Sequence, residues 1–237
     1  MNVPRTLPNS LLALVVAATA GCTAIGVRDT AYNPQIDPAN FTAAVVDNPY
    51  YPLVPGTVLK YREISEGETK ENIITVTHDT KEIMGVKCVV VHDVVMEKGR
   101  VAEDTLDWLA QDKAGNVWYF GEATKEISAG GRVSTHGSWE AGVKDARPGI
   151  LMLGQPKPGE PYRQEYGPGA AEDMGQVVAT GETVTVPAGT YTDCVKTKEW
   201  SLLESGNEHK WYAKGIGCIK EVSTAGDLVE LLSIAHE

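Results

Sequence analysis

The residues best suited to chemistry are three carboxylates that flank one glycine-rich turn. Glu165 precedes a turn of Gly, Pro and Ala residues, and Glu172 and Asp173 follow it. Carboxyl groups gathered at a sheet edge can hold a hard cation such as calcium, or act as acid and base on a glycoside. Glu140, beside a tryptophan, offers another carboxylate for such a hydrolase. We favour the simpler interpretation, a solvated acidic turn, because the protein is acidic as a whole.

Other catalytic and metal-binding signals are weak. The sequence has no nucleophile-elbow, zinc-protease, phosphate-loop or dinucleotide motif. No two histidines are spaced as a ligand pair on one predicted strand, and each has a structural or solvated alternative. The histidines are His78, His92, His136, His209 and His236. We therefore expect no metal and no cofactor, and favour a protein that is not an enzyme.

Aromatic side chains provide a different candidate site. If the loop that carries Trp139 folds over the sheet, an aromatic set could line a cleft for an apolar or sugar ligand. The predicted ligand-binding residues are Trp118, Trp139, Tyr162 and Trp211. The alternative is that these rings fill the core, because the chain has only two Phe and needs bulky side chains.

Three cysteines follow Cys22 in the chain. Cys194 and Cys218 each alternate with lysines along a predicted strand, so both could point to the same kind of face. We predict a Cys194–Cys218 disulfide, which would leave Cys88 as a free thiol. The alternative is that all three are small buried hydrophobic residues, since connectivity cannot be deduced from sequence.

The N-terminus indicates export and a lipid anchor. Arg5 precedes an apolar run from Leu11 to Ala20, which is too short to span a bilayer, and the run ends at Gly21-Cys22. This pattern resembles a bacterial lipobox, which implies cleavage before Cys22, lipid on that residue and attachment to a membrane. An ordinary secretory signal is the alternative. We expect a location in the bacterial cell envelope, at the outer membrane or cell surface.

Charge and length limit the remaining possibilities. The formal net charge of −11 opposes binding to nucleic acid or to a membrane through a large basic patch. We predict a lipoprotein signal peptide at residues 1–21, a flexible tether at 22–41 and a single β domain at 42–237. A domain of this size can bury a core without covalent staples.

The elements that must position these residues are short strands separated by Gly-rich turns. This spacing predicts an all-β fold, an antiparallel meander curved into an open or partly closed barrel, with a β-sandwich as the alternative. The clearest hairpin reverses at residues 112–116, between Leu106 and Phe120. We predict that this hairpin lies in the core, with Trp118 buried.

Several segments together resemble a known family. They are NPYYPLVPGT, DWLAQDKAGNVWYFGE, GSWEAGVKDARPGI, YRQEYGPGAAED and WYAKGIG. This pattern, from Phe41 to about Leu232, resembles a family of uncharacterised secreted bacterial proteins and lipoproteins, which brings no assigned activity. The closing segments VTVPAGTYTDC and WYAKGIGCIKEV also resemble the last strands of curved-sheet periplasmic lipoproteins.

These observations predict a non-enzymatic envelope lipoprotein. We expect it to bind a small apolar or sugar ligand, or an envelope protein, through its curved sheet and the Gly/Pro loop from Gly137 to Gly154. A hydrolase that uses the carboxylates above is one alternative. A purely structural envelope component is another.

Overall fold

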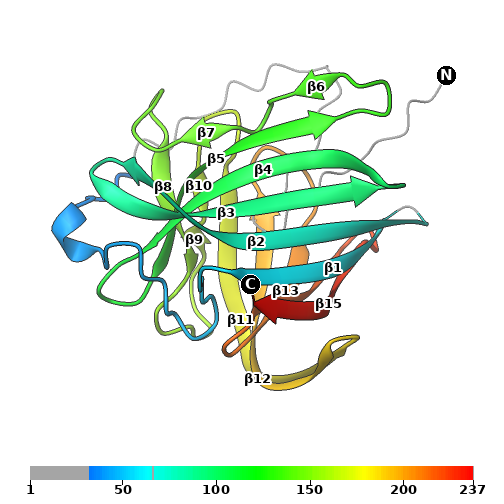
Figure 1. Cartoon of the computed structure of the whole chain (residues 1–237). Helices are drawn as coiled ribbons and strands as arrows, with labels where there is room; N and C mark the ends of the chain where they lie inside the picture. Colours follow the sequence, from blue (N-terminus) through cyan, green and yellow to red (C-terminus); the bar gives the residue numbers. More distant parts are fainter. Residues whose placement is uncertain (1–31, 66, 237) are drawn as a thin grey trace.

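The structure, a computed structural model, describes residues 32–65 and 67–236. This part of the chain consists of antiparallel strands, connecting loops and one short 3-10 turn (Figure 1). The elements are η1 (Pro38–Asn40), β1 (Thr57–Ser65), β2 (Glu68–Ile83), β3 (Val86–Glu97), β4 (Arg100–Gln111), β5 (Val117–Ile127), β6 (Val133–Ser134), β7 (Trp139–Glu140), β8 (Arg147–Met152), β9 (Tyr162–Arg163), β10 (Glu165–Tyr166), β11 (Asp173–Val186), β12 (Gly189–Ser201), β13 (Glu208–Ala213), β14 (Gly217–Ser223) and β15 (Leu228–His236).

The strands form one continuous sheet. Strands β1 to β5 pair in sequence order, and so do β11 to β15. Strand β1 pairs with β15, so the first and last parts of the chain join in the middle of the sheet. The sheet curves back on itself, with β1–β5 on one side and β11–β13 behind them (Figure 1). At one edge of the sheet β10 pairs with β8, and at the other edge β9 pairs with β11.

A short segment at residues 162–166 brings these two edges together. Strand β9 pairs with β11 and β10 pairs with β8, so Gln164 lies between the edges. The Gln164 backbone N–H donates to the Asp173 carbonyl at 2.9 Å, and its side-chain amide donates to the Leu151 carbonyl at 3.4 Å. A Cβ on Gly149 would lie 2.2 Å from the Gln164 carbonyl oxygen, so only glycine permits this approach. The predicted antiparallel meander, curved into an open or partly closed barrel, is confirmed, and the sheet is nearly closed, with a seam between its edges.

The barrel interior is apolar at one end and polar at the other. Along β1, Leu59, Tyr61 and Glu63 are buried. Lys60, which lies between Leu59 and Tyr61, is exposed. On β4, Asp107 is buried and its neighbour Leu106 is 39% exposed, so the side chain of Asp107 faces the interior of the barrel. We call the polar half the polar chamber. Its buried acidic residues are Glu63, Asp93, Glu103, Asp107, Glu122, Glu165, Asp173, Glu199, Glu208, Glu221 and Asp227.

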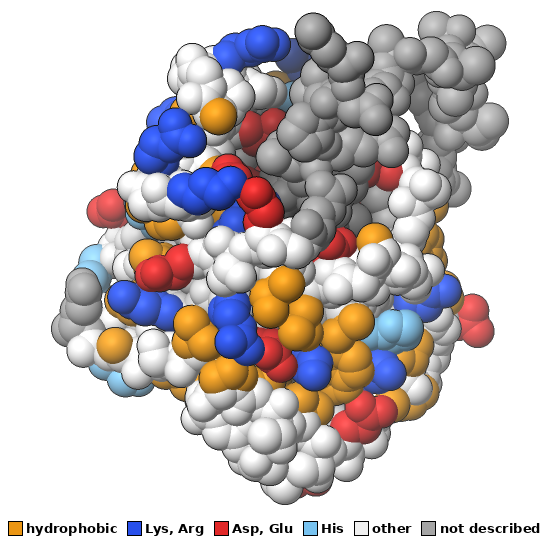
Figure 2. Space-filling model, turned by 90° about the vertical axis from the view of Figure 1, so that its right-hand side faces the viewer, with side chains coloured by type: hydrophobic (Ala, Val, Ile, Leu, Met, Phe, Trp, Pro, Cys, Tyr) orange, Lys and Arg blue, Asp and Glu red, His pale blue; other side chains and the backbone are white. Residues whose placement is uncertain are grey.

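The polar chamber lies toward the end that carries the β1–β2 and β3–β4 turns, at the right of Figure 1. Figure 2 looks onto this end, where acidic, basic and hydrophobic side chains lie side by side on the surface. The opposite end is closed by the loop before β1, from which Val46, Tyr51 and Leu53 enter the apolar core. The Tyr51 ring packs against that of Tyr212, with centroids 6.2 Å apart.

The predicted hairpin is present, but one of its tryptophans is not in the core. Strands β4 and β5 meet at a turn in which Gly115 has φ of +87°. Tyr119 is fully buried, whereas Trp118 is half-buried on the outer surface, because the two alternate along β5. The Trp118 indole N–H donates to Asp112 at 2.8 Å, and its ring packs against Phe41. The prediction that Trp118 is buried in the core was therefore wrong.

The predicted Cys194–Cys218 disulfide is also wrong. Both residues, and Cys88, are buried free thiols. Cys194 lies on β12 and Cys218 on β14, with β13 between them. Two strand spacings separate the backbones by roughly 10 Å, beyond the roughly 7 Å that a disulfide can span. The three cysteines behave as small buried hydrophobic residues, which was the alternative.

Candidate functional site

Lys210 is a buried lysine that lies among acids in the polar chamber. Lys210 on β13 faces inward with Glu221 of β14 in register beside it, and Glu199 of β12 is in register with Glu208. The Lys210 ammonium lies 3.1 Å from Glu208, 3.3 Å from Glu199 and 3.8 Å from Glu221. The Tyr212 hydroxyl donates to Glu199 at 3.0 Å. We call these residues, Glu199, Glu208, Lys210, Tyr212 and Glu221, the Lys210 cluster.

The pKa values in the Lys210 cluster follow from this geometry. Burial alone would lower the pKa of Lys210, but Glu199, Glu208 and Glu221 raise it well above its usual range. The single ammonium cannot balance three carboxylates. Burial raises the pKa of Glu221 well above its usual value, against the opposing effect of Lys210. The lysine is therefore charged, and burial favours the protonated form of Glu221.

A second group of acids lies on β4, β5 and β10. Asp107 and Glu122 are directly opposed across the β4–β5 ladder, and both face inward. The Tyr119 hydroxyl lies between them, 2.5 Å from an oxygen of Asp107 and 3.3 Å from one of Glu122. Glu165, which is 1% exposed, reaches the chamber from β10. We call Asp107, Tyr119, Glu122 and Glu165 the Asp107 cluster.

The Asp107 cluster contains unsatisfied carboxyl oxygens. Asp107 Oδ2, Glu122 Oε1 and Glu165 Oε2 are buried without a hydrogen-bond partner among the described residues. No lysine or arginine of the described chain forms an ion pair with these three acids. Burial raises the pKa of Asp107 to about 7, and raises those of Glu122 and Glu165 well above their usual range. These acids are therefore stabilised by protonation rather than by ion pairing.

The chamber has little free space. A cavity of about 10 Å³ lies between the two clusters, lined by Gln164, Glu165, Asp173, Glu199, Trp200, Glu208 and Lys210. This volume accommodates about one water molecule. Within residues 32–65 and 67–236, no three His, Cys, Asp or Glu side chains are arranged to hold a metal ion. The chamber has no room for a sugar or another organic ligand.

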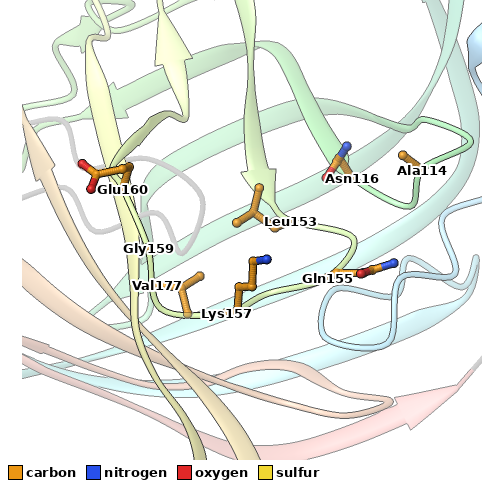
Figure 3. Close-up of a pocket in the computed structure, with 8 residues that line it drawn as sticks. All are labelled: Ala114, Asn116, Leu153, Gln155, Lys157, Gly159, Glu160 and Val177. Atoms are coloured by element: carbon orange, nitrogen blue, oxygen red, sulfur yellow. The ribbon is translucent and has the colours of Figure 1, made fainter.

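A larger space opens at the seam of the barrel, near the β4–β5 turn. This cleft has a volume of about 400 Å³ (Figure 3). It lies between that turn, the end of β8, the loop that follows β8, and β11. We call it the seam cleft, and its lining residues are Ala114, Asn116, Leu153, Gln155, Lys157, Gly159, Glu160 and Val177.

Hydrogen bonds and close backbone contacts fix one wall of the seam cleft. The Asn116 side-chain amide donates to Asp112 at 2.8 Å, and its carbonyl oxygen accepts from the Gly154 backbone N–H at 2.9 Å. A Cβ on Gly154 would lie 2.2 Å from the Ala114 carbonyl oxygen, so the loop after β8 needs glycine to reach the turn. These contacts hold the wall in one position, as in a preformed binding site.

The four aromatic residues predicted to bind a ligand do not share a cleft. Trp139 is 7% exposed and packs edge-to-face against Tyr119 at 5.5 Å, inside the barrel. Tyr162 lies on β9 at the seam, and Trp118 packs outside the barrel against a phenylalanine. Trp211 lies on the outer surface of β13, where its indole N–H donates to a glutamate at 2.6 Å. Alternation along different strands separates the four rings.

The carboxylates singled out from the sequence are divided between two environments. Glu165 and Asp173 both face the polar chamber, and burial raises the pKa of Asp173 to about 7. Glu140 lies on the surface and pairs with Lys81 at 2.7 Å, and Glu172 lies 3.8 Å from an arginine. The favoured interpretation of a solvated turn was therefore wrong for Glu165 and Asp173.

Two predictions concern the membrane. The predicted signal peptide and Cys22 lie outside the described residues. Among the described residues, no helix has the length and apolarity needed to cross a bilayer.

Comparisons with known proteins assign no family. No protein-family model matches the chain, and no curated protein matches it either. Among solved structures, the chain is similar to a crystal structure described as "a putative lipoprotein from Parabacteroides distasonis ATCC 8503". The match has a TM-score of 0.45 and 12% identity, and covers 82% of this chain and 100% of the other.

Proposed function

We propose that this protein is a lipid-anchored envelope protein that binds a small amphipathic ligand in the seam cleft without catalysing a reaction. The supporting observation is the seam cleft itself, whose volume of about 400 Å³ falls within the usual range for small-molecule sites. The lipid anchor rests on the lipobox-like sequence that ends at Cys22.

The lining residues indicate the class of ligand. Leu153 and Val177 form apolar surface, and Lys157 and Glu160 add one charge of each sign. A ligand with an apolar body and a polar or charged end would match this arrangement, because apolar contact supplies affinity and a few polar groups fix orientation. Asn116 is already engaged with its neighbours, so it shapes the site rather than supplying a free amide.

A hydrolase is a weaker alternative for two reasons. The buried acids that resemble a catalytic pair lie around a space of about 10 Å³, which leaves no room for a glycoside. The seam cleft has the room, but Glu160 is the single carboxylate among its lining residues. Acid–base hydrolysis of a glycoside ordinarily requires two carboxylates on opposite sides of the bond.

A filled-cleft variant tests the binding proposal. Ala114→Trp places an indole in the seam cleft from an exposed turn, and Ala225→Trp adds the same ring to an exposed turn between β14 and β15. Titration with the fluorescent amphiphile anilinonaphthalene sulfonate should show saturable binding to the original protein and to Ala225→Trp. Ala114→Trp should weaken binding about tenfold or more. Equal affinity for both variants would overturn the assignment of the site.

Metabolic labelling tests the anchor. The native chain expressed in a bacterium should incorporate labelled palmitate, and Cys22→Ala should lose the label. Unchanged labelling in that variant would overturn the anchor proposal.

A further inference from the structure

The outer surface of β12 and β13 combines tryptophans with lysines. On β12 the outward side chains are Lys196, Lys198 and Trp200, and on β13 they are His209 and Trp211. The Lys196 ammonium lies 4.7 Å from the centroid of a Trp211 ring, and that of Lys198 lies 5.6 Å from a Trp200 ring. These distances fall in the range of cation–π contacts. We call these five residues the Trp–Lys face.

The Trp–Lys face carries two lysines, against one adjoining carboxylate, that of Glu182, which accepts a hydrogen bond from the Trp211 indole at 2.6 Å. Neither Lys196 nor Lys198 forms an ion pair with a carboxylate of the described residues. Burial lowers the pKa of His209, and the charges of the two lysines lower it further. An anionic surface would be attracted here despite the formal net charge of −11.

An apolar tip adjoins this face. Leu202 and Leu203 follow Trp200 in the turn between β12 and β13, and they are 51% and 44% exposed. The order along the hairpin is therefore exposed leucines at the tip, then tryptophan, then lysines. This is the order in which groups meet a bilayer, because leucine enters the acyl boundary, tryptophan prefers the interface and lysine reaches the phosphates.

The start of the described chain lies near the same tip. The Tyr32 ring packs against Tyr166 at 5.6 Å, and the turn after Tyr166 leads to Glu172, whose carbonyl accepts the Leu202 backbone N–H at 2.9 Å. Ten residue steps separate Cys22 from Tyr32, which span at most about 36 Å when fully extended. A lipid on Cys22 would therefore hold this end of the barrel close to the membrane.

We propose that the β12–β13 tip and the Trp–Lys face dock on a bilayer that contains anionic phospholipid, as a second membrane contact beside the lipid. This inference rests on the proposed anchor at Cys22, and it adds an orientation in which the polar end of the barrel faces the membrane. A second contact would add to the attachment that the lipid supplies and would fix the orientation of the barrel on the membrane. Each lysine near an anionic surface contributes attraction that salt screens.

The test uses the full lipidated chain in vesicles of phosphatidylethanolamine and phosphatidylglycerol. An environment-sensitive fluorophore is attached to Leu203→Cys at the tip or, as a matched control, to Val54→Cys, an exposed position at the opposite end. The natural thiols in the described part are buried, which favours selective labelling. Sedimentation with the vesicles reports the anchor, and emission with aqueous iodide quenching reports the environment of the probe.

We expect both proteins to sediment with the vesicles. The Leu203→Cys probe should shift to shorter wavelength and lose iodide quenching, whereas the Val54→Cys probe should remain in water. Adding Lys196→Glu and Lys198→Glu should return the tip probe toward water without releasing the protein. Sedimentation with the tip probe fully quenched would overturn the docking inference alone. Failure to sediment would overturn the anchor, and the docking inference with it.

Discussion

The Lys210 cluster and the Asp107 cluster occupy the same barrel interior but balance their buried acids differently. In the first, an ammonium lies 3.1 to 3.8 Å from three carboxylates. In the second, three acids and a tyrosine share the space, and buried oxygens lack hydrogen-bond partners among the described residues. A buried carboxylate must be paired with a cation or neutralised by a proton. The Lys210 cluster uses both means, and the Asp107 cluster depends on protonation.

This difference makes the two clusters respond oppositely to mutation. Removing the only cation of the Lys210 cluster leaves buried charge uncompensated. Neutralising an acid of the Asp107 cluster removes a group that is costly to ionise. The comparison can therefore be tested by free energies of unfolding, measured with urea at several pH values.

Replacement of Lys210 should have the largest effect. Lys210→Met keeps the shape of the side chain but leaves Glu199 and Glu208 without their ammonium. We expect the free energy of unfolding at pH 7 to fall by about 3–5 kcal/mol, with part of the loss recovered at pH 5 because burial raises the pKa of Glu208 and favours its protonated form. The control is Lys196→Met on the outer surface, with an expected change within about 0.5 kcal/mol. A similarly small change for Lys210→Met would remove the distinction between the clusters.

The pH profile of stability should show that the chamber prefers protons. Burial raises the pKa values of Glu103, Asp107 and Asp173 to about 7 in the folded protein, above the values near 4 of an unfolded chain. Between these limits the folded state binds more protons, so its stability is fully present below about pH 4 and is lost as the pH rises through 7. Each such group contributes a slope of roughly 1.4 kcal/mol per pH unit. A profile that rises from pH 5 to pH 8 would contradict this account.

Asp107→Asn should stabilise the protein at alkaline pH. The amide preserves the shape and cannot ionise, so the cost of a buried carboxylate at pH 8 disappears. We expect a gain on the order of 1–3 kcal/mol at pH 8 and little change at pH 5. The matched variant in the other cluster, Glu199→Gln, should lose stability instead because it removes a partner of Lys210. If both variants change stability with the same sign, the two clusters are not different in kind.

The two buried tyrosines should show the smallest difference. Tyr212→Phe removes a hydrogen bond to Glu199 beside the ammonium, and Tyr119→Phe removes hydrogen bonds to Asp107 and Glu122, two acids whose pKa values burial raises. Bonds to charged groups contribute about 1.5–3 kcal/mol, against about 0.5–1.5 kcal/mol for neutral pairs. Tyr212→Phe should therefore lower the free energy of unfolding at pH 7 by roughly 1 kcal/mol more than Tyr119→Phe. Equal losses in the free energy of unfolding for the two variants would contradict the difference between the two clusters.

The barrel was predictable from sequence because its signals are local. Alternation and Gly-rich turns fix strand lengths and antiparallel pairing, as in the hairpin around Gly115. The closure of the sheet was not predictable, because it depends on Gln164 bonding to two strands that are distant in the chain. The wrong prediction of a Cys194–Cys218 disulfide has the same origin. The sequence pattern shows which face of a strand a cysteine is on, but it does not show which strands are neighbours in the sheet.

The polar chamber had a signal in the sequence that alternation alone could not interpret. Glu103, Thr105 and Asp107 share one face of β4. A strand with such a polar face ordinarily turns it to solvent, and the inversion appears only when the partners across the barrel are known. The seam cleft left no signal, because its residues come from a turn, a loop and two strand ends.

The most direct test of the central claim is a carbon-13 NMR titration of the aspartate carboxyl groups. The Asp107 signal can be assigned by its absence in Asp107→Asn. The account predicts that this carboxyl titrates with a midpoint near pH 7, because burial opposes its ionisation and the described chain places no cation beside it. A midpoint near pH 4, the value of an aspartate in water, would show that Asp107 is ionised in the folded protein and would contradict the account.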